Sequence, residues 1–390
     1  MKSYKRIDTQ LVHAGTPDPR IEGAVAMPIF QSANFEYAGE SRYDDLRYLR
    51  LNNTPNHLAL HRLLSALEHA PDALVAGSGM AAISTTLLTV LSAGDHVLAQ
   101  DCLYGGTLDL LMNDFPKFGI DRSFIDGDAP QTWAAALHPN TRAIYVEALT
   151  NPLLDVADLT AVVAFARAHK LVSIIDSTFA SPVNFNPIDM GFDLVVHSAT
   201  KYLNGHSDIV AGAIAGSREL IAQITHKLNH LGGTLDPHAA SLLYRGLKTL
   251  ALRVRHQNQS ALAIAKFLNG HPAVAQVNYA GLESHPRHQR ARELFSGFGG
   301  VLSFELDGTM ERTRQFMQRV KIPIIAASLG GVETLLIRPA VSSHAGMTPE
   351  QRQKLGISDR LIRMSVGIEA TDELIEDLGQ ALGPADAARR

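Results

Sequence analysis

Short apolar runs recur along the middle of the chain, and segments of helix length separate most of them. Runs that are apolar at successive positions are typical of strands buried on both faces of a sheet. Alternation of such strands with helices predicts an α/β fold with a largely parallel central sheet. The runs are ALVAG at 73–77, HVLAQ at 96–100, AIYVEA at 143–148, LVSIID at 171–176, DLVVHS at 193–198 and IVAGAIAG at 209–216.

The first 55 residues lack this alternation and are predicted to form an extended arm. They include Pro28 and lead into the polar segment LRLNNTPN at 49–56. A helix is predicted from Asn56, which we expect to cap it, because the leucines that follow share one helical face. These leucines are Leu60, Leu63, Leu64 and Leu67. Residues 56–250 are predicted to be the main domain.

A smaller C-terminal α/β domain is predicted over residues 251–390. A long helix over about 238–269 is expected to lead into it. The segment PAVSSHAGMTPEQRQKLGI at 339–357 is expected to be a loop. The strand candidates of this domain are GGVLSFEL at 299–306, TLLIRP at 334–339 and LIRMSVG at 361–367.

Composition narrows the class of protein. The 390 residues are 46% hydrophobic and 19% charged, which is ordinary for a globular protein in water. The net charge of −4 and the lack of a long basic run argue against nucleic acid and membrane surfaces as partners. Cys102 is the only cysteine, so no intrachain disulfide can form. With no secretory signal pattern at the start, the cytoplasm is the expected location.

One segment concentrates small polar side chains around a lysine directly after an apolar run. Residues 197–208 read HSATKYLNGHSD and include Ser198, Thr200 and Lys201. A parallel sheet binds ligands at the carboxyl ends of its strands. There Lys201 can form a Schiff base with an aldehyde while the two hydroxyls donate to a phosphate.

Two further features follow predicted strands. Asp176 ends LVSIID, where an acid either caps a helix or supplies a functional carboxylate. Beside a Schiff-base lysine, a carboxylate can keep a pyridine nitrogen protonated. The turn Gly77–Met80 opens a helix, and its glycines allow backbone N–H groups to approach an anion, although such turns are common.

The segment DLVVHSATKYLNGHS at 193–207 resembles the lysine signature of the Cys/Met-metabolism family of pyridoxal-phosphate enzymes. Further motifs of that family follow one another in order along nearly the whole chain. They are GSGMAA at 77–82, YGGT at 104–107, EALTNP at 147–152, DSTFASP at 176–182, SLGGVETL at 328–335 and RMSVG at 363–367. The resemblance implies fold type I, a mainly parallel sheet flanked by helices, and pyridoxal 5′-phosphate as cofactor.

The resemblance also implies roles for single residues. Lys201 would bond the cofactor's aldehyde and remove the substrate's α-proton, and Asp176 would pair with the pyridine nitrogen. Tyr104 would stack on the ring and assist proton transfer. Arg363 would clamp the substrate's α-carboxylate in a two-point geometry, assisted by Ser328. The remaining cofactor contacts would be Gly79, Met80, Ser198 and Thr200 at the phosphate and Asn151 at the ring hydroxyl.

In this family a Tyr-x-Arg of the neighbouring subunit reaches the cofactor phosphate. Tyr48 and Arg50 fit that role in this sequence. The family's usual pattern is close to Tyr-Ser-Arg-x-x-Asn-Pro-Thr, whereas this chain reads YLRLNNTPN with a displaced proline. The arm is therefore expected to reach another subunit, and the resemblance implies a homotetramer built from active dimers.

The reaction expected from the resemblance is α,γ-elimination of L-cystathionine, the activity of cystathionine γ-lyase. The SLGG segment resembles γ-lyases and γ-synthases, whereas β-lyases tend to carry Tyr and Trp there, and the single Trp133 is distant in sequence. Gly106 stands where methionine γ-lyases often have cysteine. Glu333 resembles an acid associated with cystathionine handling, although a solvated glutamate is the plain alternative.

Other activities stay open at this point. Cystathionine γ-synthase, which replaces an activated homoserine side group with cysteine, is the main alternative. Methionine γ-lyase, cystathionine β-lyase, and transaminase or aldolase chemistry are further ones. A catalytically silent cofactor-binding protein is the alternative from another class. No metal is expected, since His285-x-x-His288 lies in a polar segment expected to be solvated.

Overall fold

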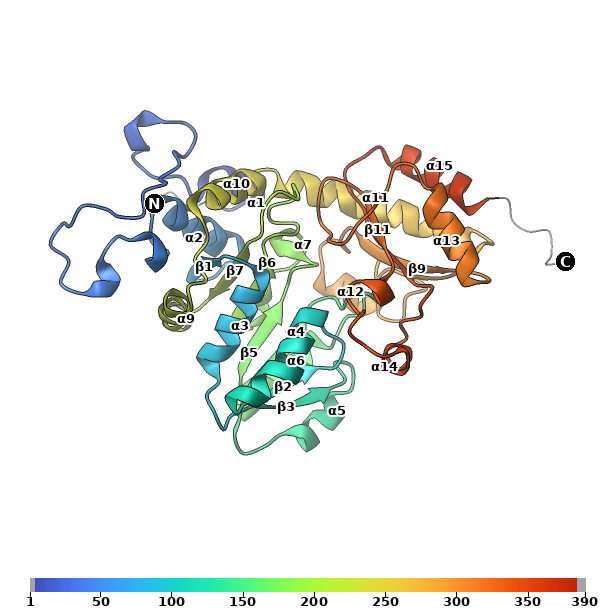
Figure 1. The fold of residues 1–390 in the computed structure, drawn as a ribbon, viewed down its shortest axis with the longest axis horizontal. Helices are drawn as coiled ribbons and strands as arrows, with labels where there is room; N and C mark the ends of the chain where they lie inside the picture. Colours follow the sequence, from blue (N-terminus) through green and yellow to red (C-terminus); the bar gives the residue numbers. More distant parts are fainter. Residues whose placement is uncertain (1–3, 384–390) are drawn as a thin grey trace.

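The computed structural model describes residues 4–383 and contains two β-sheets with helices packed on them (Figure 1). The strands of the larger sheet lie between residues 72 and 216, and those of the smaller sheet lie between residues 274 and 365. The two sheets agree with the predicted α/β class. The domain limits 1–55, 56–250 and 251–390 stay predictions, and their outermost residues, 1–3 and 384–390, lie outside the described part.

Within residues 4–383, the larger sheet has seven strands in the order β1-β7-β6-β5-β4-β2-β3. Strand β7 is antiparallel to both of its neighbours, and every other neighbouring pair is parallel. The predicted, largely parallel sheet is confirmed. The strands are β1 (Asp72–Ala76), β2 (His96–Gln100), β3 (Asp121–Ile125), β4 (Thr141–Glu147), β5 (Val172–Asp176), β6 (Leu194–Ser198) and β7 (Gly212–Gly216).

Two properties of this sheet were not predicted. Strand β3 has the sequence DRSFI, with Asp121 exposed, because it is an edge strand and does not need a continuous apolar run. Strand β7 runs antiparallel because the chain returns directly from the segment after β6 without a crossover helix. It begins at Gly212, so Ile209–Ala211 of the predicted run belong to the loop.

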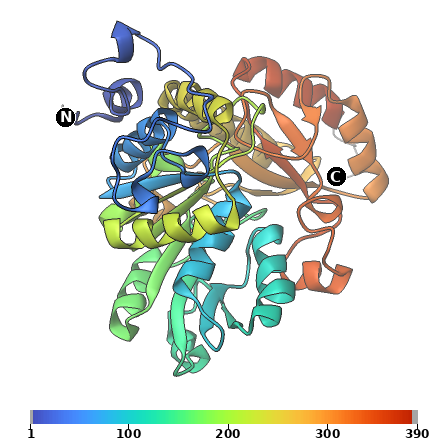
Figure 2. The ribbon, with the colours of Figure 1, turned by 60° about the vertical axis from the view of Figure 1, so that its left-hand side comes forward.

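Helices cover both faces of the larger sheet and form a three-layer arrangement (Figures 1 and 2). One face packs on α3 and α9, and the other packs on α2, α6 and α10. This burial on both faces accounts for the apolar runs in the strands. The helices are α2 (Pro55–Leu67), α3 (Gly79–Val90), α4 (Gly105–Asp109), α5 (Pro130–Trp133), α6 (Leu159–His169), α7 (Ser181–Asn184), α8 (Pro187–Met190), α9 (Arg218–Leu231) and α10 (Pro237–Leu247).

The smaller sheet has the strand order β10-β11-β12-β9-β8, with α11, α13 and α15 packed on it through a common core. All three predicted strands are present, as β9, β11 and β12. The unpredicted β8 and β10 are partly exposed and carry no long apolar run. The elements are α11 (Leu250–Gly270), β8 (Val274–Asn278), α12 (His288–Leu294), β9 (Val301–Leu306), α13 (Met310–Arg319), β10 (Ile324–Ile325), β11 (Leu335–Ile337), α14 (Pro349–Lys354), β12 (Ile362–Ser365) and α15 (Thr371–Leu382).

The start of α2 differs from the prediction. Thr54 occupies the N-cap position, and Asn56 lies inside the helix, so the predicted cap is wrong. The Asn56 side chain instead ties the arm to α2, since it accepts from the Phe30 N–H at 2.8 Å and donates to the Pro28 carbonyl at 2.9 Å. The four leucines are buried as predicted.

The predicted long helix over 238–269 is two helices, α10 and α11, which meet near Thr249. The buried Arg253 guanidinium fills this junction and donates to the carbonyls of Gly246 and Tyr202, both at 2.9 Å. The helices therefore turn where backbone carbonyls can be satisfied by a side chain. The predicted loop at 339–357 is wrong in part, because it contains α14 with a capping box of Thr348 and Gln351.

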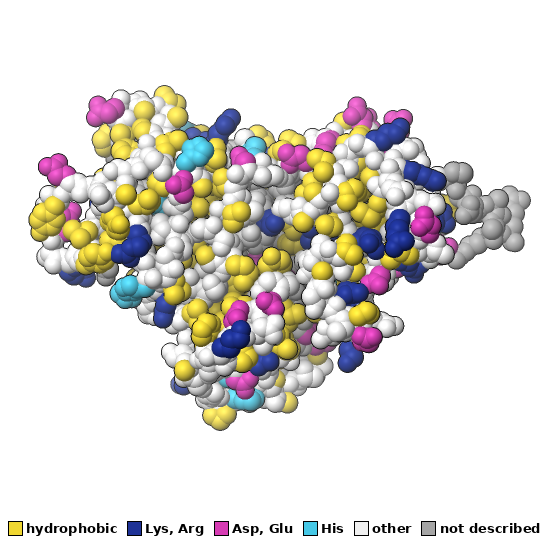
Figure 3. Space-filling view, viewed as in Figure 1, with side chains coloured by type: hydrophobic (Ala, Val, Ile, Leu, Met, Phe, Trp, Pro, Cys, Tyr) yellow, Lys and Arg dark blue, Asp and Glu magenta, His cyan; other side chains and the backbone are white. Residues whose placement is uncertain are grey.

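The arm contains short elements and long extended stretches that project from the larger sheet (Figures 1 and 2). Figure 3 shows hydrophobic side chains on these projecting loops. Val25 is 81% exposed and Tyr37 is 67% exposed, which is unusual for side chains of this size. No helix among residues 4–383 is long and apolar enough to cross a membrane. The arm's elements are α1 (Ile7–His13), η1 (Ile21–Gly23), η2 (Tyr43–Asp45) and η3 (Leu49–Leu51).

Candidate active site

A cavity of about 530 Å³ lies at the carboxyl ends of β4, β5 and β6 and is closed on its other side by segments of the C-terminal part. Parallel sheets bind ligands at this edge. Ten of the predicted site residues line it, together with residues for which no role was predicted. The ten are Gly79, Met80, Tyr104, Asn151, Asp176, Ser198, Thr200, Lys201, Ser328 and Arg363.

Lys201 lies three residues beyond the end of β6, and its amine faces this cavity. The Lys201 Nζ donates a hydrogen bond to Ser328 Oγ at 2.7 Å. Burial, helped by the positive charge of Arg363, lowers the pKa of Lys201 from 10.5 to about 8. The fraction of this amine that is neutral, and so able to attack a carbonyl carbon, is therefore larger near neutral pH than for a lysine in water.

Asp176 is the last residue of β5 and is buried in the cavity wall. Its Oδ1 accepts from the Thr178 N–H at 2.9 Å, and its Oδ2 accepts from the Tyr145 hydroxyl at 3.4 Å. Burial raises the pKa of Asp176, while its contacts with Thr178 act in the opposite direction. The carboxyl thus accepts from the turn after the strand and lines the cavity. It caps no helix, because the next helix, α7, has Ala180 at its N-cap position, and its role as a functional carboxylate stays a prediction.

The turn between β1 and α3 forms a close-fitting corner of the cavity. Ser78 caps α3, and its hydroxyl accepts from the Ala81 N–H at 2.9 Å. A Cβ placed on Gly79 would come within 2.8 Å of the Ser198 Cβ, so only glycine fits between the helix start and the loop after β6. This corner combines a helix N-terminus with hydroxyl groups, which is the donor set that a phosphate requires.

The two hydroxyl residues of this corner differ in their surroundings. Ser198 and Thr200 both line the cavity. The Thr200 hydroxyl donates to the Ala211 carbonyl at 3.1 Å and accepts from the Ala211 N–H at 2.9 Å, so it closes the loop around Lys201. The Ser198 N–H is held by Thr178 Oγ1 at 2.8 Å. These bonds fix the segment 198–200 that precedes Lys201, and the hydrogen of the Thr200 hydroxyl is donated within the protein.

Arg363 enters from β12 of the smaller sheet and is buried. It donates to Asn151 Oδ1 at 3.1 Å and to the Ser328 carbonyl at 2.9 Å. Its Nε is buried and has no hydrogen-bond partner among the described residues. Burial lowers the pKa of Arg363 to about 10. A positively charged group with an unsatisfied donor in a cavity is suited to bind a carboxylate.

Sequence reasoning missed one acid of this site, Glu147. It ends β4, lines the cavity and is buried, and its Oε1 accepts from the Tyr104 N–H at 2.6 Å. Burial and the neighbouring Asp176 raise the pKa of Glu147 well above its usual value. Its position as a lone acid at the end of the run AIYVEA was the available signal, the same one that pointed to Asp176.

Three predicted site residues do not line this cavity. Tyr48 and Arg50 lie on the arm, where Arg50 donates to the Asn229 carbonyl at 2.9 Å. Glu333 accepts from the Ser207 hydroxyl at 3.2 Å, so it contacts the end of the lysine segment and not the cavity wall. The tyrosine and arginine were expected to act on a neighbouring subunit, and this stays a prediction.

No group of three or more metal-binding side chains is found within residues 4–383. The expectation that His285 and His288 are solvated is wrong for His285, which is buried beside Leu282 and Arg287. Burial lowers the pKa of His285 to about 4. The His288 Nδ1 contacts the Ala280 carbonyl at 2.9 Å, so both rings are held by local contacts.

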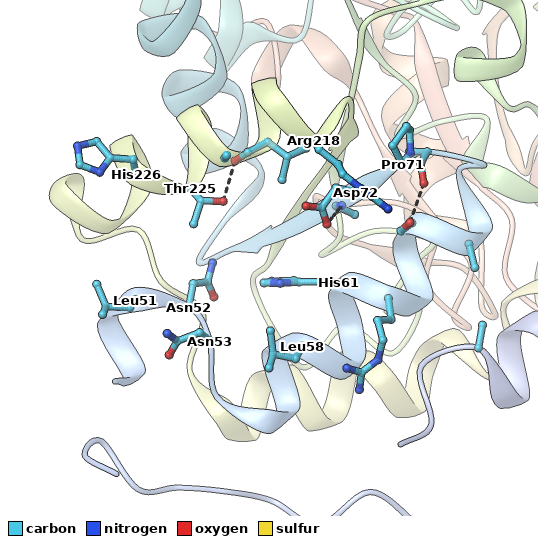
Figure 4. Close-up of a pocket in the computed structure, with 18 of the residues that line it drawn as sticks. Leu51, Asn52, Asn53, Leu58, His61, Pro71, Asp72, Arg218, Thr225 and His226 are labelled. Carbon is cyan, nitrogen blue, oxygen red and sulfur yellow. Dashed lines mark hydrogen bonds between the residues drawn. The ribbon is translucent and has the colours of Figure 1, made fainter. Parts of the chain in front are cut away.

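A second, larger cavity of about 1000 Å³ lies between the arm, α2, β1 and α9. Figure 4 shows the imidazole of His61 projecting from α2 into it. His61 Nε2 and the buried side-chain oxygens of Asn52 and Asn229 have no hydrogen-bond partner among the described residues. None of the predicted catalytic residues lines this cavity, so we place the chemistry in the smaller one.

Comparison with known proteins decides the family. The family model described as "Cys/Met metabolism PLP-dependent enzyme" matches residues 8–383. The chain belongs to this family. It is an enzyme that uses pyridoxal phosphate (PLP), and it is a carbon–sulfur lyase of cysteine and methionine metabolism.

Individual family members are similar over nearly their whole length. The chain is 41% identical over 375 residues to cystathionine gamma-lyase of Bacillus subtilis (strain 168), covering 96% of this chain and 98% of that protein. It is 41% identical over 377 residues to cystathionine beta-lyase of Lactococcus lactis subsp. cremoris (strain MG1363), with the same coverage. The crystal structure of cystathionine gamma-lyase from Lactobacillus plantarum complexed with L-serine superposes with a TM-score of 0.92 at 37% identity, covering 97% of this chain and 98% of that one.

These likenesses confirm the predicted fold type I architecture with its smaller second sheet. The residues present in the cavity also fit the family's cofactor. Lys201 supplies an amine of lowered pKa, Asp176 supplies a carboxyl group, and the corner at Gly79 has room for backbone donors but not for a side chain. An aldehyde, a ring nitrogen and a phosphate each find a suitable group within one cavity.

Proposed function

We propose that this protein is a cystathionine γ-lyase, which converts L-cystathionine and water to cysteine, 2-oxobutanoate and ammonia. The observation that carries the proposal is the placement of the Lys201 amine and the Arg363 guanidinium on either side of Ser328 in one cavity. A base and a carboxylate-binding group so arranged fit an amino-acid substrate whose α-carbon lies beside the lysine.

The residues divide into those that hold the cofactor and those that hold the substrate. The cofactor would be held by Lys201 and Asp176, by the backbone of Gly79 and Met80, and by Ser198 and Thr200, with Asn151 and Tyr104 beside its ring. When bound, pyridoxal phosphate supplies an electron-withdrawing ring that stabilises negative charge at the substrate's α-carbon. Lys201 takes the α-proton at its Nζ, and the same mobile amine serves the β-carbon in γ-elimination.

Arg363 would bind the substrate's α-carboxylate. Its contacts with Asn151 and the Ser328 carbonyl hold the guanidinium at the cavity, and its buried Nε has no hydrogen-bond partner among the described residues. Asn151 and Ser328 would complete the pocket. Tyr104 is placed where its phenol could assist transfer of a proton to the leaving sulfur.

The preference for γ-elimination rests on sequence features near the cavity. SLGG at 328–331 resembles γ-lyases and γ-synthases, and Trp133 is buried in a hydrophobic core far along the chain from it. Gly106 lies where methionine γ-lyases often have cysteine. A Cβ at this position would approach the Tyr104 ring to 2.7 Å, so a larger residue requires a different ring position.

Cystathionine γ-synthase is the main alternative, and methionine γ-lyase and cystathionine β-lyase are further ones. Relatives named cystathionine gamma-lyase and cystathionine beta-lyase are equally identical to this chain, so overall identity does not separate these activities. A relative named L-methionine gamma-lyase, from Fusobacterium nucleatum subsp. polymorphum, is 38% identical. Glu333 contacts Ser207 at the end of the lysine segment, and contact with the distal amino group of cystathionine is the role proposed for it.

A product assay on the purified enzyme tests the proposal. Cystathionine, methionine, homocysteine and O-acylhomoserine with cysteine are offered separately. The products measured are 2-oxobutanoate, pyruvate, cysteine, homocysteine, cystathionine and methanethiol. The γ-lyase is expected to release 2-oxobutanoate and cysteine from cystathionine. Pyruvate and homocysteine would indicate β-lyase, and cystathionine formed from acylhomoserine and cysteine would indicate γ-synthase. A bound cofactor with no turnover would favour the silent protein, and an amino group retained in a keto-acid exchange would favour a transaminase.

We also propose that the active form is a homotetramer of two active dimers, acting in the cytoplasm on a sulfur-containing amino acid without nucleic acid or membrane. The exposed apolar side chains of the arm and the unsatisfied polar atoms of the larger cavity support contact with a second copy. Tyr48 and Arg50 would then reach the partner's phosphate corner. Light scattering measures the mass of the assembly. Mixing Arg50→Ala protein with Lys201→Ala protein tests whether two subunits share an active site, since each mixed dimer should then regain activity at one of its two sites.

A further inference from the structure

Glu147 is the one buried acid of the active site to which no role has been given so far. It is the last residue of β4 and pairs in register with Asp176, the last residue of β5. Its Oε1 accepts from the Tyr104 N–H at 2.6 Å, so it connects the end of the sheet with the segment that carries the aromatic ring. A buried acid with a specific backbone partner in a ligand cavity needs a functional or structural reason.

The segment that receives this hydrogen bond is poorly able to hold itself in place. Tyr104 is the N-cap of α4, which spans only Gly105–Asp109 and begins with two glycines. An N–H at this position has no acceptor within the helix, and glycine adds backbone freedom. The glycines are required, because a Cβ on Gly106 would come within 2.7 Å of the Tyr104 ring and one on Gly105 would collide with the Ser343 carbonyl.

The Tyr104 ring is itself weakly packed, since the residue is 43% exposed. Its orientation over the cavity therefore depends on the backbone from which it projects more than on neighbouring side chains. The Glu147 carboxyl provides the anchor for that backbone, from an element that is fixed on both sides by strand pairing. A rigid strand thus positions a flexible, glycine-rich turn.

The protonation of Glu147 fits this task. Two buried carboxyl groups side by side do not both ionise readily, and burial together with Asp176 raises the pKa of Glu147 well above its usual value. Asp176 is the better stabilised anion, because it accepts from Thr178 and lies near His197. A neutral Glu147 still accepts the Tyr104 N–H through its carbonyl oxygen and adds no charge next to Asp176.

We propose that Glu147 is a positioning residue that holds the Tyr104 backbone, and thereby its ring, at the wall of the cofactor cavity. The role of the ring rests on the proposed function, whereas the anchoring of the backbone does not. Glutamine has the shape of a neutral glutamate and retains a carbonyl oxygen, so Glu147→Gln should substitute for it. Alanine lacks the acceptor, and aspartate is one methylene too short to reach.

The test compares Glu147→Gln, Glu147→Asp and Glu147→Ala with the wild-type protein. Glu305→Ala serves as the control, since Glu305 is a partly buried acid that pairs with Arg360 in the smaller sheet. Amide hydrogen exchange of the peptide that contains Tyr104 is measured in cofactor-free protein. The circular dichroism of the visible cofactor band, kcat and KM are measured in loaded protein. Thermal unfolding checks that each variant is folded.

The Ala and Asp variants are expected to exchange the Tyr104 amide about tenfold faster or more, to weaken the cofactor's circular dichroism, and to lower kcat about tenfold with a smaller change in KM. Glu147→Gln is expected to restore slow exchange and most of kcat, and Glu305→Ala is expected to resemble wild type.

Unchanged exchange in Glu147→Ala and Glu147→Asp would overturn the proposal. A Gln variant as impaired as Ala in exchange and kcat would also overturn it, because the charge would then be required. If the Glu147→Ala variant fails to fold, the Glu147→Asp and Glu147→Gln variants still test the proposal. If the wild-type protein does not turn over cystathionine, the proposed function is refuted, but the hydrogen-exchange result on the Tyr104 backbone stays valid.

Discussion

The amine of Lys201 donates a hydrogen bond to the hydroxyl of Ser328 at 2.7 Å, although 127 residues separate the two in sequence. Ser328 has a φ of +96°, which is unusual for a residue with a side chain, and its carbonyl accepts from Arg363. Ser328 thus contacts both the proposed base, Lys201, and the proposed carboxylate-binding group, Arg363. This contact holds the larger sheet's lysine against a segment that precedes the smaller sheet's β11.

Replacing Lys201 with alanine should abolish covalent attachment of the cofactor. The variant loses the only amine that faces the cavity among the described lining residues, and kcat should fall by about 10²–10⁴-fold because the base is lost. Borohydride treatment followed by peptide mass analysis should label residue 201 in wild type and nothing at that position in the variant. A labelled peptide elsewhere in wild type would contradict the assignment.

The reactivity of the cofactor-free protein should depend on pH. An amine attacks an aldehyde only when neutral, and burial lowers the pKa of Lys201 to about 8. The rate at which added pyridoxal phosphate binds covalently should therefore rise with pH, with a midpoint near 8. Since the charge of Arg363 contributes to this lowering, Arg363→Met should move the midpoint to higher pH. Equal midpoints in the two proteins would show that the two side chains are not coupled.

Arg363→Lys should weaken substrate binding while the cofactor stays bound. Lysine keeps the positive charge but cannot form the planar two-point contact with a carboxylate. We expect KM for cystathionine to rise about 10-fold to 100-fold, from the loss of one charge-assisted hydrogen bond. Steady-state kinetics with the visible absorbance as a control measures this. Arg360→Lys, two residues before β12 and outside the cavity, should leave KM unchanged.

Gly79→Ala should damage the phosphate corner. The added Cβ would lie 2.8 Å from the Ser198 Cβ, so the helix start or the segment before Lys201 must move. Affinity for the cofactor should fall at least about tenfold, measured by dialysis or fluorescence. Gly270→Ala is the matched control: Gly270 ends α11, its added Cβ meets no atom within 4 Å, and its φ is not positive. Equal cofactor affinity in both variants would count against the corner as the phosphate site.

The sequence revealed the strands that are buried on both faces of the sheet. It did not reveal the strands that contact solvent. The runs that became β4, β5 and β6 are buried on both faces, so their composition alone reveals them. The edge strand β3 and the two-residue β10 contact solvent and carry no such mark. The junction of α10 and α11 was missed because Arg253, which satisfies the carbonyls there, acts through contacts with Gly246 and Tyr202.

The same division applies to the site. Lys201 and Asp176 could be found because a polar residue directly after a buried strand is conspicuous and parallel strands end at one edge. Glu147 stands in the same position, yet its partner Tyr104 is 43 residues away, and no local pattern joins them. The sequence by itself determined the fold class and the family motifs, and it pointed to Lys201 as the candidate reactive lysine, because these depend on local composition and order along the chain. Only the tertiary structure decided which distant groups meet at the cavity, since burial beside Arg363 and contact with Ser328 arise when the two sheets pack together.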